Sequence, residues 1–153
     1  MTSYRFRVRF EYEPTALWRD VVVGENRTLD EFQAVINRSV GLNQAHLWFF
    51  GTDRDYWQSP VQYKRSEELD LAGPTTSDET KYDASETTIG EMVRQLDLDE
   101  DDRICYLFDY GDEWRFYATL ENVDSDGSSD RGPTVVKETG DPVEQYALPD
   151  EWE

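Results

Sequence analysis

Residues 104–121, ICYLFDYGDEWRFYATLE, decide the fold of this chain. Residues 104–108 form a nearly continuous apolar run, which is typical of a strand buried on both faces. Residues 109–112 (DYGD) favour a chain reversal, because Asp bonds nearby backbone and Gly111 accepts a positive φ without steric cost. Residues 114–120 alternate between apolar and polar side chains, as in a half-buried strand. We therefore expect two strands joined by an acidic turn, with carboxylates and a large aromatic at one sheet edge.

The N-terminal segment shows the clearest strand periodicity of the chain. Residues 4–12 alternate strictly, which predicts a strand, and residues 17–23 (LWRDVVV) predict a second one. The short link between them favours an antiparallel hairpin. The first strand is expected to point Tyr4, Phe6, Val8, Phe10 and Tyr12 inward and Arg5, Arg7, Arg9 and Glu11 outward.

Two amphipathic helices are predicted by the same start signal, a Thr followed three residues later by a Glu. Thr28 with Glu31 and Thr88 with Glu91 each fit a capping box, in which the two side chains satisfy free backbone N–H groups. Apolar residues then recur every three or four positions, as on a helix face that packs on a sheet. Gly41 ends the first helix.

We predict an α+β fold: one domain over residues 1–153, with a mixed, mostly antiparallel sheet and two helices packed on one face. Residues 46–50 (HLWFF) predict a third buried strand, and residues 134–137 a last strand at an edge. Residues 51–86 form an irregular excursion, in which 61–64 is a short strand, and residues 138–153 form a polar tail.

The charge balance is informative about the environment of the protein rather than about a ligand. The 153 residues contain 34 acidic and 15 basic side chains, giving a net charge of −19, and only three of the bases are Lys. We infer a halophilic cytoplasm, where salt screens surface charges over about 3 Å at 1 M; an acidic mesophilic protein is the alternative. The N-terminus lacks the apolar region of a signal peptide, and no apolar run is long enough to span a membrane. We therefore expect a cytoplasmic protein with no membrane contact.

The same charge argues against broad nucleic-acid binding, which needs clustered Lys and Arg. Arg5, Arg7 and Arg9 are the local exception, because they share one face of the first strand. They either pair with acidic side chains across the sheet or contact nucleic acid, and the second reading requires their guanidinium groups to be exposed and unpaired.

The candidate site residues gather around the acidic turn. His46 is the single histidine, so a multi-histidine metal site is excluded, and the single cysteine excludes a disulfide within the chain. Carboxylates at the turn suit either local turn structure, an oxygen-ligand site for Mg²⁺ or Ca²⁺, or an acid–base pair. The candidate binding residues are His46, Asp109, Asp112, Trp114, Glu121 and Tyr146.

Residues 106–114 (YLFDYGDEW) resemble the core of the plasmid pRiA4b ORF-3-like family, Tyr-x-Asp-Phe-Gly-Asp-x-Trp-x-His, which an Ile/Val-x-Leu-Glu strand follows. Leu120-Glu121 matches the end of that strand, and the N-terminal half is similar as well. The resemblance weakens in the tail, where Pro142, Glu144 and Tyr146 alone match the family's pattern. The family's frequent His falls on Phe116, so any role of that His is absent here.

The resemblance implies a compact α+β domain, often plasmid- or transposon-associated, with no established activity to carry over. Our leading hypothesis is a non-enzymatic binding or adaptor module for a protein or peptide, with no cofactor. Its site would lie where His46, Asp109, Asp112 and Trp114 converge, closed by Tyr146. One alternative is a metal-assisted hydrolase using Asp109, Asp112 and Glu121; another is nucleic-acid association through Arg5, Arg7 and Arg9. The aromatic residues Tyr56 and Trp57 are the expected anchors for a partner.

Overall fold

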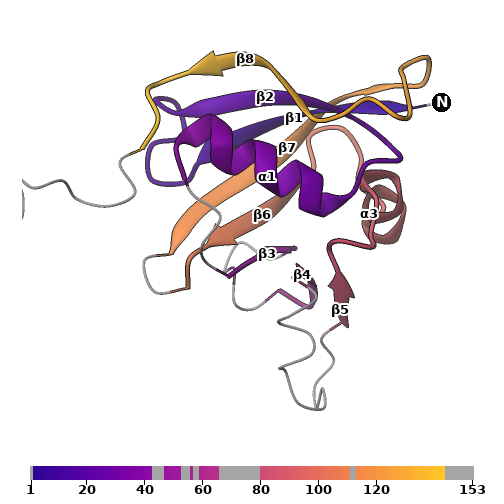
Figure 1. The fold of residues 1–153 in the computed structure, drawn as a ribbon, viewed down its shortest axis with the longest axis horizontal. Helices are drawn as coiled ribbons and strands as arrows, with labels where there is room; N and C mark the ends of the chain where they lie inside the picture. The colour runs from indigo at the N-terminus through magenta and orange to yellow at the C-terminus, as the bar shows by residue number, and fades with distance from the viewer. Residues whose placement is uncertain are drawn as a thin grey trace, which may run out of the picture.

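The computed structural model describes residues 2–42, 47–52, 56, 59–65, 80–110 and 113–143. Eight strands form one sheet in the order β5-β4-β3-β6-β7-β1-β2-β8, which runs from the bottom to the top of Figure 1. Neighbouring strands pair antiparallel except β4 and β5, which are parallel, so the predicted mixed α+β fold is confirmed. The strands are β1 (Ser3–Phe10), β2 (Trp18–Gly24), β3 (Trp48–Gly51), β4 (Val61–Lys64), β5 (Thr80–Asp83), β6 (Arg103–Phe108), β7 (Trp114–Asp124) and β8 (Thr134–Thr139).

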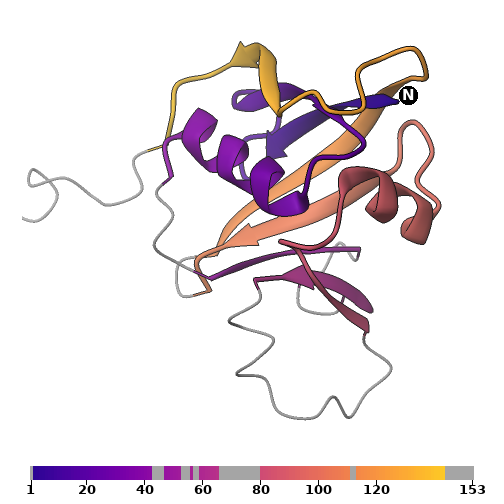
Figure 2. The same cartoon turned by 45° about the vertical axis from the view of Figure 1, so that its right-hand side comes forward.

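Two helices, α1 (Leu29–Val40) and α3 (Ile89–Leu96), lie on the same face of the sheet (Figures 1 and 2). Thr28 forms the predicted capping box with Glu31, and Gly41 ends α1 with a φ of 88°. At α3, the Thr88 hydroxyl accepts a hydrogen bond from the backbone N–H of Glu91. A helix begins in both cases where a side chain replaces the missing backbone acceptor of the first turn.

The two helix starts also lie side by side. The N–H of Leu29 donates to the Thr87 carbonyl at 2.9 Å, and the N–H of Ile89 donates to the Arg27 carbonyl at 2.8 Å. These reciprocal bonds satisfy one free N–H at the start of each helix. Each helix is followed by a strand in the middle of the sheet, α1 by β3 and α3 by β6. The backbone hydrogen bonds between the two helix starts therefore connect the beginnings of these two helix–strand units.

A stack of aromatic rings fills the space between the helices and the sheet. Phe32 of α1 stacks on Phe50 of β3 at 5.8 Å between ring centroids, and Phe50 stacks on Tyr106 of β6 at 4.8 Å. The alternation in β1 and β7 adds Phe6 and Phe116, both fully buried. Large rings compensate in buried area for the low content of aliphatic residues.

The first strand is shorter than expected, and this corrects one inward residue. β1 ends at Phe10, whose N–H donates to the Leu17 carbonyl at 3.0 Å as the hairpin closes. Tyr12 lies beyond this point and is 59% exposed, so the prediction that it faces the core was wrong. The alternating pattern continued past the residue where the turn begins.

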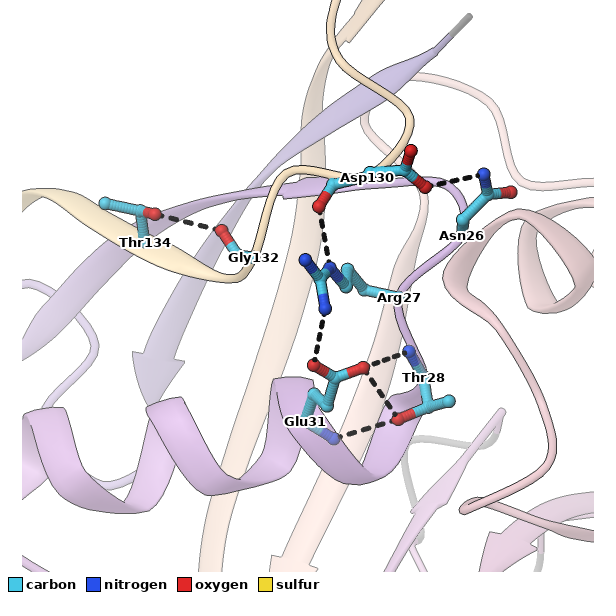
Figure 3. A network of polar contacts seen from close by, with 7 residues as sticks. All are labelled: Asn26, Arg27, Thr28, Glu31, Asp130, Gly132 and Thr134. Atoms are coloured by element: carbon cyan, nitrogen blue, oxygen red, sulfur yellow. Dashed lines mark hydrogen bonds and ion pairs between the residues drawn. The ribbon is translucent and has the colours of Figure 1, made fainter.

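Polar contacts fix α1 to its surroundings at two places. In the core, the Tyr106 hydroxyl donates to Asn37 Oδ1 and accepts from Gln33 Nε2 at 2.8 Å. At the helix start, Arg27 Nε donates to the Asp130 carbonyl at 2.7 Å, as Figure 3 shows. Arg27 also pairs with Glu31, and Asn26 donates to the Asp130 carboxylate. The loop before β8 is therefore held against the first turn of α1.

The opposite face of the sheet carries neither α1 nor α3, and we refer to it as the helix-free face. A second, smaller apolar cluster lies there, made of Phe49, Tyr56, Cys105 and Leu107. Tyr56 is 1% exposed and its hydroxyl donates to the Phe116 carbonyl at 2.9 Å. The expectation that Tyr56 is an exposed partner anchor was therefore wrong; it covers the sheet instead. Neither described helix has the length and apolarity needed to cross a bilayer.

Candidate functional site

The acidic turn begins where β6 ends, and the backbone there is unusual. The N–H of Asp109 donates to the Leu47 carbonyl at 2.8 Å, and the Asp109 carbonyl accepts from the N–H of Glu113 at 2.6 Å. Asp109 and Glu113 both adopt positive φ, 65° and 52°. A non-glycine residue held in this region costs on the order of 1–3 kcal/mol, and such residues cluster at functional sites. Sequence reasoning had assigned positive φ to Gly111, which lies outside the described residues.

Trp114 follows immediately and presents a buried donor. Its ring packs on Phe10 at 5.9 Å between centroids, with the rest of the indole against the main core. The indole Nε1–H is buried and has no hydrogen-bond partner among the described residues. An unpaired buried donor costs about 1–3 kcal/mol, which a bound acceptor would recover. Asp109, at 8% exposure, lies next to it at the same end of the sheet.

The structure does not bring Glu121 to this end. Glu121 is seven residues beyond Trp114 on β7, which is about 23 Å along an extended strand. It lies instead near Arg7, where its charge contributes to the raised pKa of that guanidinium, after the larger effect of the hydrogen bond to Asp20. His46, Asp112 and Tyr146 lie outside the described residues, as does Trp57. Within the described part of the chain, no three His, Cys, Asp or Glu side chains are grouped so that they hold a metal.

Two of the three outward arginines of β1, Arg5 and Arg7, pair with one carboxylate. Arg5 Nη2 lies 2.6 Å from Asp20 Oδ2, and Arg7 donates two hydrogen bonds to the same carboxylate, at 2.7 and 2.9 Å. Burial raises the pKa of Asp20, but the hydrogen bonds from Arg7 and Arg5 outweigh it, so this pKa lies below its usual range. Arg9 donates to the Pro14 carbonyl at 2.7 Å. This pairing supports the interpretation that Arg5 and Arg7 bind an acidic side chain across the sheet, although two guanidinium groups share one carboxylate.

A pocket of about 250 Å³ lies on the helix-free face, and sequence reasoning did not find it. Cys105 and Tyr117, which are paired across β6 and β7, line it together with Tyr56 and Thr52. The Thr52 hydroxyl is buried without a hydrogen-bond partner in the described chain. The two-residue period of side chains along a strand was the available signal, because it places Cys105 on the face opposite Tyr106. The charged residues of the rim are Glu11, Asp101, Asp102 and Arg103.

Comparison with known proteins supports the fold and gives no activity. The sequence model described as plasmid pRiA4b ORF-3-like protein matches residues 2–147. A similar solved structure is a protein of unknown function, MM3350 from Methanosarcina mazei Go1, with a TM-score of 0.63 and 14% identity. The likeness covers 90% of this chain and 68% of that chain, and at this identity it shows the fold alone. No curated protein matches the chain.

Proposed function

The chain belongs to the plasmid pRiA4b ORF-3-like family, and we propose that it is a non-enzymatic binding module whose site lies where β6 turns into β7. The observation that carries this proposal is the buried, unpartnered indole N–H of Trp114. Folding leaves this donor without a described acceptor, beside two residues in left-handed conformations. Unpaired buried donors and left-handed backbone conformations lower the stability of the fold, and they are typically retained at functional sites.

The chemistry of this end suits a segment of peptide. The ligand must offer a hydrogen-bond acceptor to the Trp114 N–H and must also tolerate the carboxylates of Asp109 and Glu113 nearby. A peptide backbone supplies carbonyl acceptors and N–H donors together, and its side chains can pack on the aromatic rings. We therefore assign a protein or peptide partner to this site, with His46, Asp112 and Tyr146 proposed as further contacts.

The hydrolase alternative receives less support from the geometry. It needs Asp109, Asp112 and Glu121 within ligand distance of one ion, and Glu121 lies about 23 Å along β7 from the turn. The family's frequent His position is Phe116 here, a fully buried ring that packs against Phe10 at 5.1 Å. That position therefore offers no acid or base to a reaction.

The proposed setting is a halophilic cytoplasm. The excess of 34 acidic over 15 basic side chains keeps a surface hydrated at high salt, where the charges are screened. Binding measurements therefore belong in concentrated KCl, in which contacts made by aromatic rings and short hydrogen bonds persist better than long-range attraction.

The test is a selection of binding peptides followed by a change of one donor. Peptides selected from a random display library on the wild-type protein are measured by titration calorimetry against wild type, Trp114→Phe and Trp18→Phe. Trp114→Phe keeps a ring and removes the donor, so we expect affinity to fall at least about fivefold, the loss of roughly 1 kcal/mol. Trp18→Phe removes an indole on the helix-free face and should leave affinity unchanged. Equal binding by all three proteins would refute the assigned site.

A further inference from the structure

The sheet sorts the charges of the chain between its faces, and this sorting is independent of the site at Trp114. Among the described residues, outward strand positions on the helix-free face contain four of the 34 acidic residues, namely Asp20, Asp83, Glu121 and Asp124. The same positions contain eight of the 15 basic residues, namely Arg5, Arg7, Arg9, Lys64, Lys81, Arg103, Arg115 and Lys137. At these strand positions basic residues thus outnumber acidic ones two to one, although the protein as a whole is strongly acidic.

The strand register arranges part of this face into two neighbouring rows. In one row Lys137, Asp20, Arg7, Thr119 and Arg103 follow one another across β8, β2, β1, β7 and β6. In the next row the corresponding positions on β2, β1 and β7 are Trp18, Arg9 and Tyr117. The first row is therefore mainly cationic and the second contains two aromatic rings.

Cations and rings of the two rows are in contact. The Arg7 guanidinium lies 4.0 Å from the centroid of the Trp18 ring, and the Arg103 guanidinium lies 4.4 Å from the centroid of Tyr117. Lys137 lies on β8, on the other side of β2 from Arg7, and its Nζ is 5.7 Å from the centroid of the Trp18 ring. Two strand spacings separate the rings, which is about 10 Å. Each arginine–ring pair presents flat π surfaces beside a positive charge.

The positive charge that remains in the two rows after pairing lies at Arg9, Arg103 and Lys137, which form no ion pair with the other described residues. Asp20 is fully buried and binds both Arg5 and Arg7, and the charge of the nearby Glu121 offsets the one positive charge that Asp20 leaves. Arg115, by contrast, pairs with Glu113 at 2.6 Å and adds little. Asp101 and Asp102 border the pocket beside Arg103 and Tyr117, so an anionic chain would lead from these two residues across β7 and β1 toward β2 and β8, away from the two carboxylates.

We propose that the helix-free face binds single-stranded nucleic acid, with bases stacked at Trp18 and Tyr117 and phosphates at Arg9, Arg103 and Lys137. Charge complementarity and ring spacing together favour this partner. Bases stack on aromatic rings and on guanidinium planes, and the phosphates of the same chain meet the cations. An acidic peptide would contact the cations but would offer no bases to stack on the aromatic rings. In a duplex the faces of the bases are already stacked on one another and cannot reach the rings.

The test is fluorescence anisotropy with labelled oligouridylate and oligothymidylate, competed by inorganic polyphosphate and by a DNA duplex. Wild type is compared with Tyr117→Leu, Tyr117→Phe and Arg103→Gln, and Arg38→Gln on the exposed surface of α1 is the matched control. Thermal melts confirm that each variant folds. Tyr117→Phe keeps the ring, which separates stacking from any loss of packing.

We expect Tyr117→Leu to lose at least about fivefold in affinity, while Tyr117→Phe and Arg38→Gln bind like wild type. Three phosphate contacts predict a slope of log affinity against log salt of about −2, and Arg103→Gln should reduce it by about 0.7. Equal competition by polyphosphate or duplex, or equal binding by Tyr117→Leu, would overturn the proposal. The absence of oligonucleotide binding by a folded wild type would overturn it as well, and would leave the peptide site at Trp114 untouched.

Discussion

Asp20→Asn is the substitution for which the structure gives the sharpest expectation. The Asp20 side chain is fully buried and accepts three hydrogen bonds from Arg5 and Arg7, of 2.6 to 2.9 Å. Asn keeps the size but leaves two guanidinium charges without their counter-charge. Removing one partner of a buried ion pair costs about 3–5 kcal/mol. Because the arginine side chains are 37% and 24% exposed, water compensates part of this, and we expect about 2–3 kcal/mol.

Thermal unfolding in concentrated KCl at neutral pH measures this difference. For a chain of this length, 1 kcal/mol corresponds to a shift in Tm of about 2–4 °C, so the variant should melt roughly 5–10 °C lower. The exposed Asp126→Asn is the matched control and should stay within about 0.5 kcal/mol of wild type. A variant at Asp20 that melts with the wild type would refute the account of this ion pair.

The pH dependence provides a second check on the same residue. The pKa of Asp20 in the fold lies below the ordinary value of 3.8. A lowered carboxyl pKa contributes stability that is complete above the ordinary value and is lost as the pH falls through the folded value. The difference between wild type and Asp20→Asn should therefore be constant from pH 7 to about pH 5 and narrow progressively below pH 4. A difference that stays constant into strong acid would contradict the assignment.

Three further expectations concern single elements of the structure. Arg19→Lys should lower the free energy of unfolding by about 2 kcal/mol in chemical denaturation, because the buried guanidinium donates to four carbonyls and an ammonium cannot reach them all. An unchanged free energy of unfolding would refute the role of these four hydrogen bonds. Thr28→Ala should cost about 1 kcal/mol through loss of the capping box, with no change in the position of other helix signals by NMR. Excess Mg²⁺, Ca²⁺ or Mn²⁺ should not raise Tm specifically; a gain of about 2.7 kcal/mol, as at a hundredfold over Kd, would restore the hydrolase alternative.

The elements that the sequence predicted well are those in which local signals agree with the tertiary fold. The capping pair Thr28 and Glu31, the stop at Gly41 and the alternation of β7 all appear as expected. Tyr12 shows where this reasoning fails, because period-two alternation does not mark the residue at which a hairpin closes. β5 was not predicted, since an edge strand with one parallel neighbour has only a short and weakly apolar pattern.

The site was harder to predict because it depends on which residues the sheet brings together. Asp109 and Trp114 are close in sequence, and the structure places both at one end of the sheet. Glu121 belonged to the same motif, yet the length of β7 carries it to the other end. Composition also concealed the helix-free face, since a net charge of −19 describes the whole surface and not its distribution. The pairing of Trp18 with Arg9, and of Arg9 with Tyr117, is set by strand order alone.

Asp20 links the helix-free face to the stability of the fold. Its removal frees Arg5 and Arg7, so Asp20→Asn should bind oligonucleotides more tightly while it unfolds more easily. The same carboxylate thus limits the charge of the face and holds β1 to β2. Trp114→Phe, unlike Asp20→Asn, should not destabilise the fold strongly, because it removes a donor that has no partner. Its Tm should stay within a few degrees of wild type.

The indole N–H resonance of Trp114 gives the most direct test of the proposed binding site. In ¹⁵N-labelled protein, the signal is assigned by its loss in Trp114→Phe, and it is followed as a selected peptide is added. We predict that this indole proton shifts downfield and exchanges more slowly with water, because it gains an acceptor on binding. If the peptide saturates the protein while this resonance stays in place, the donor is not used and the site at the β6–β7 turn is contradicted.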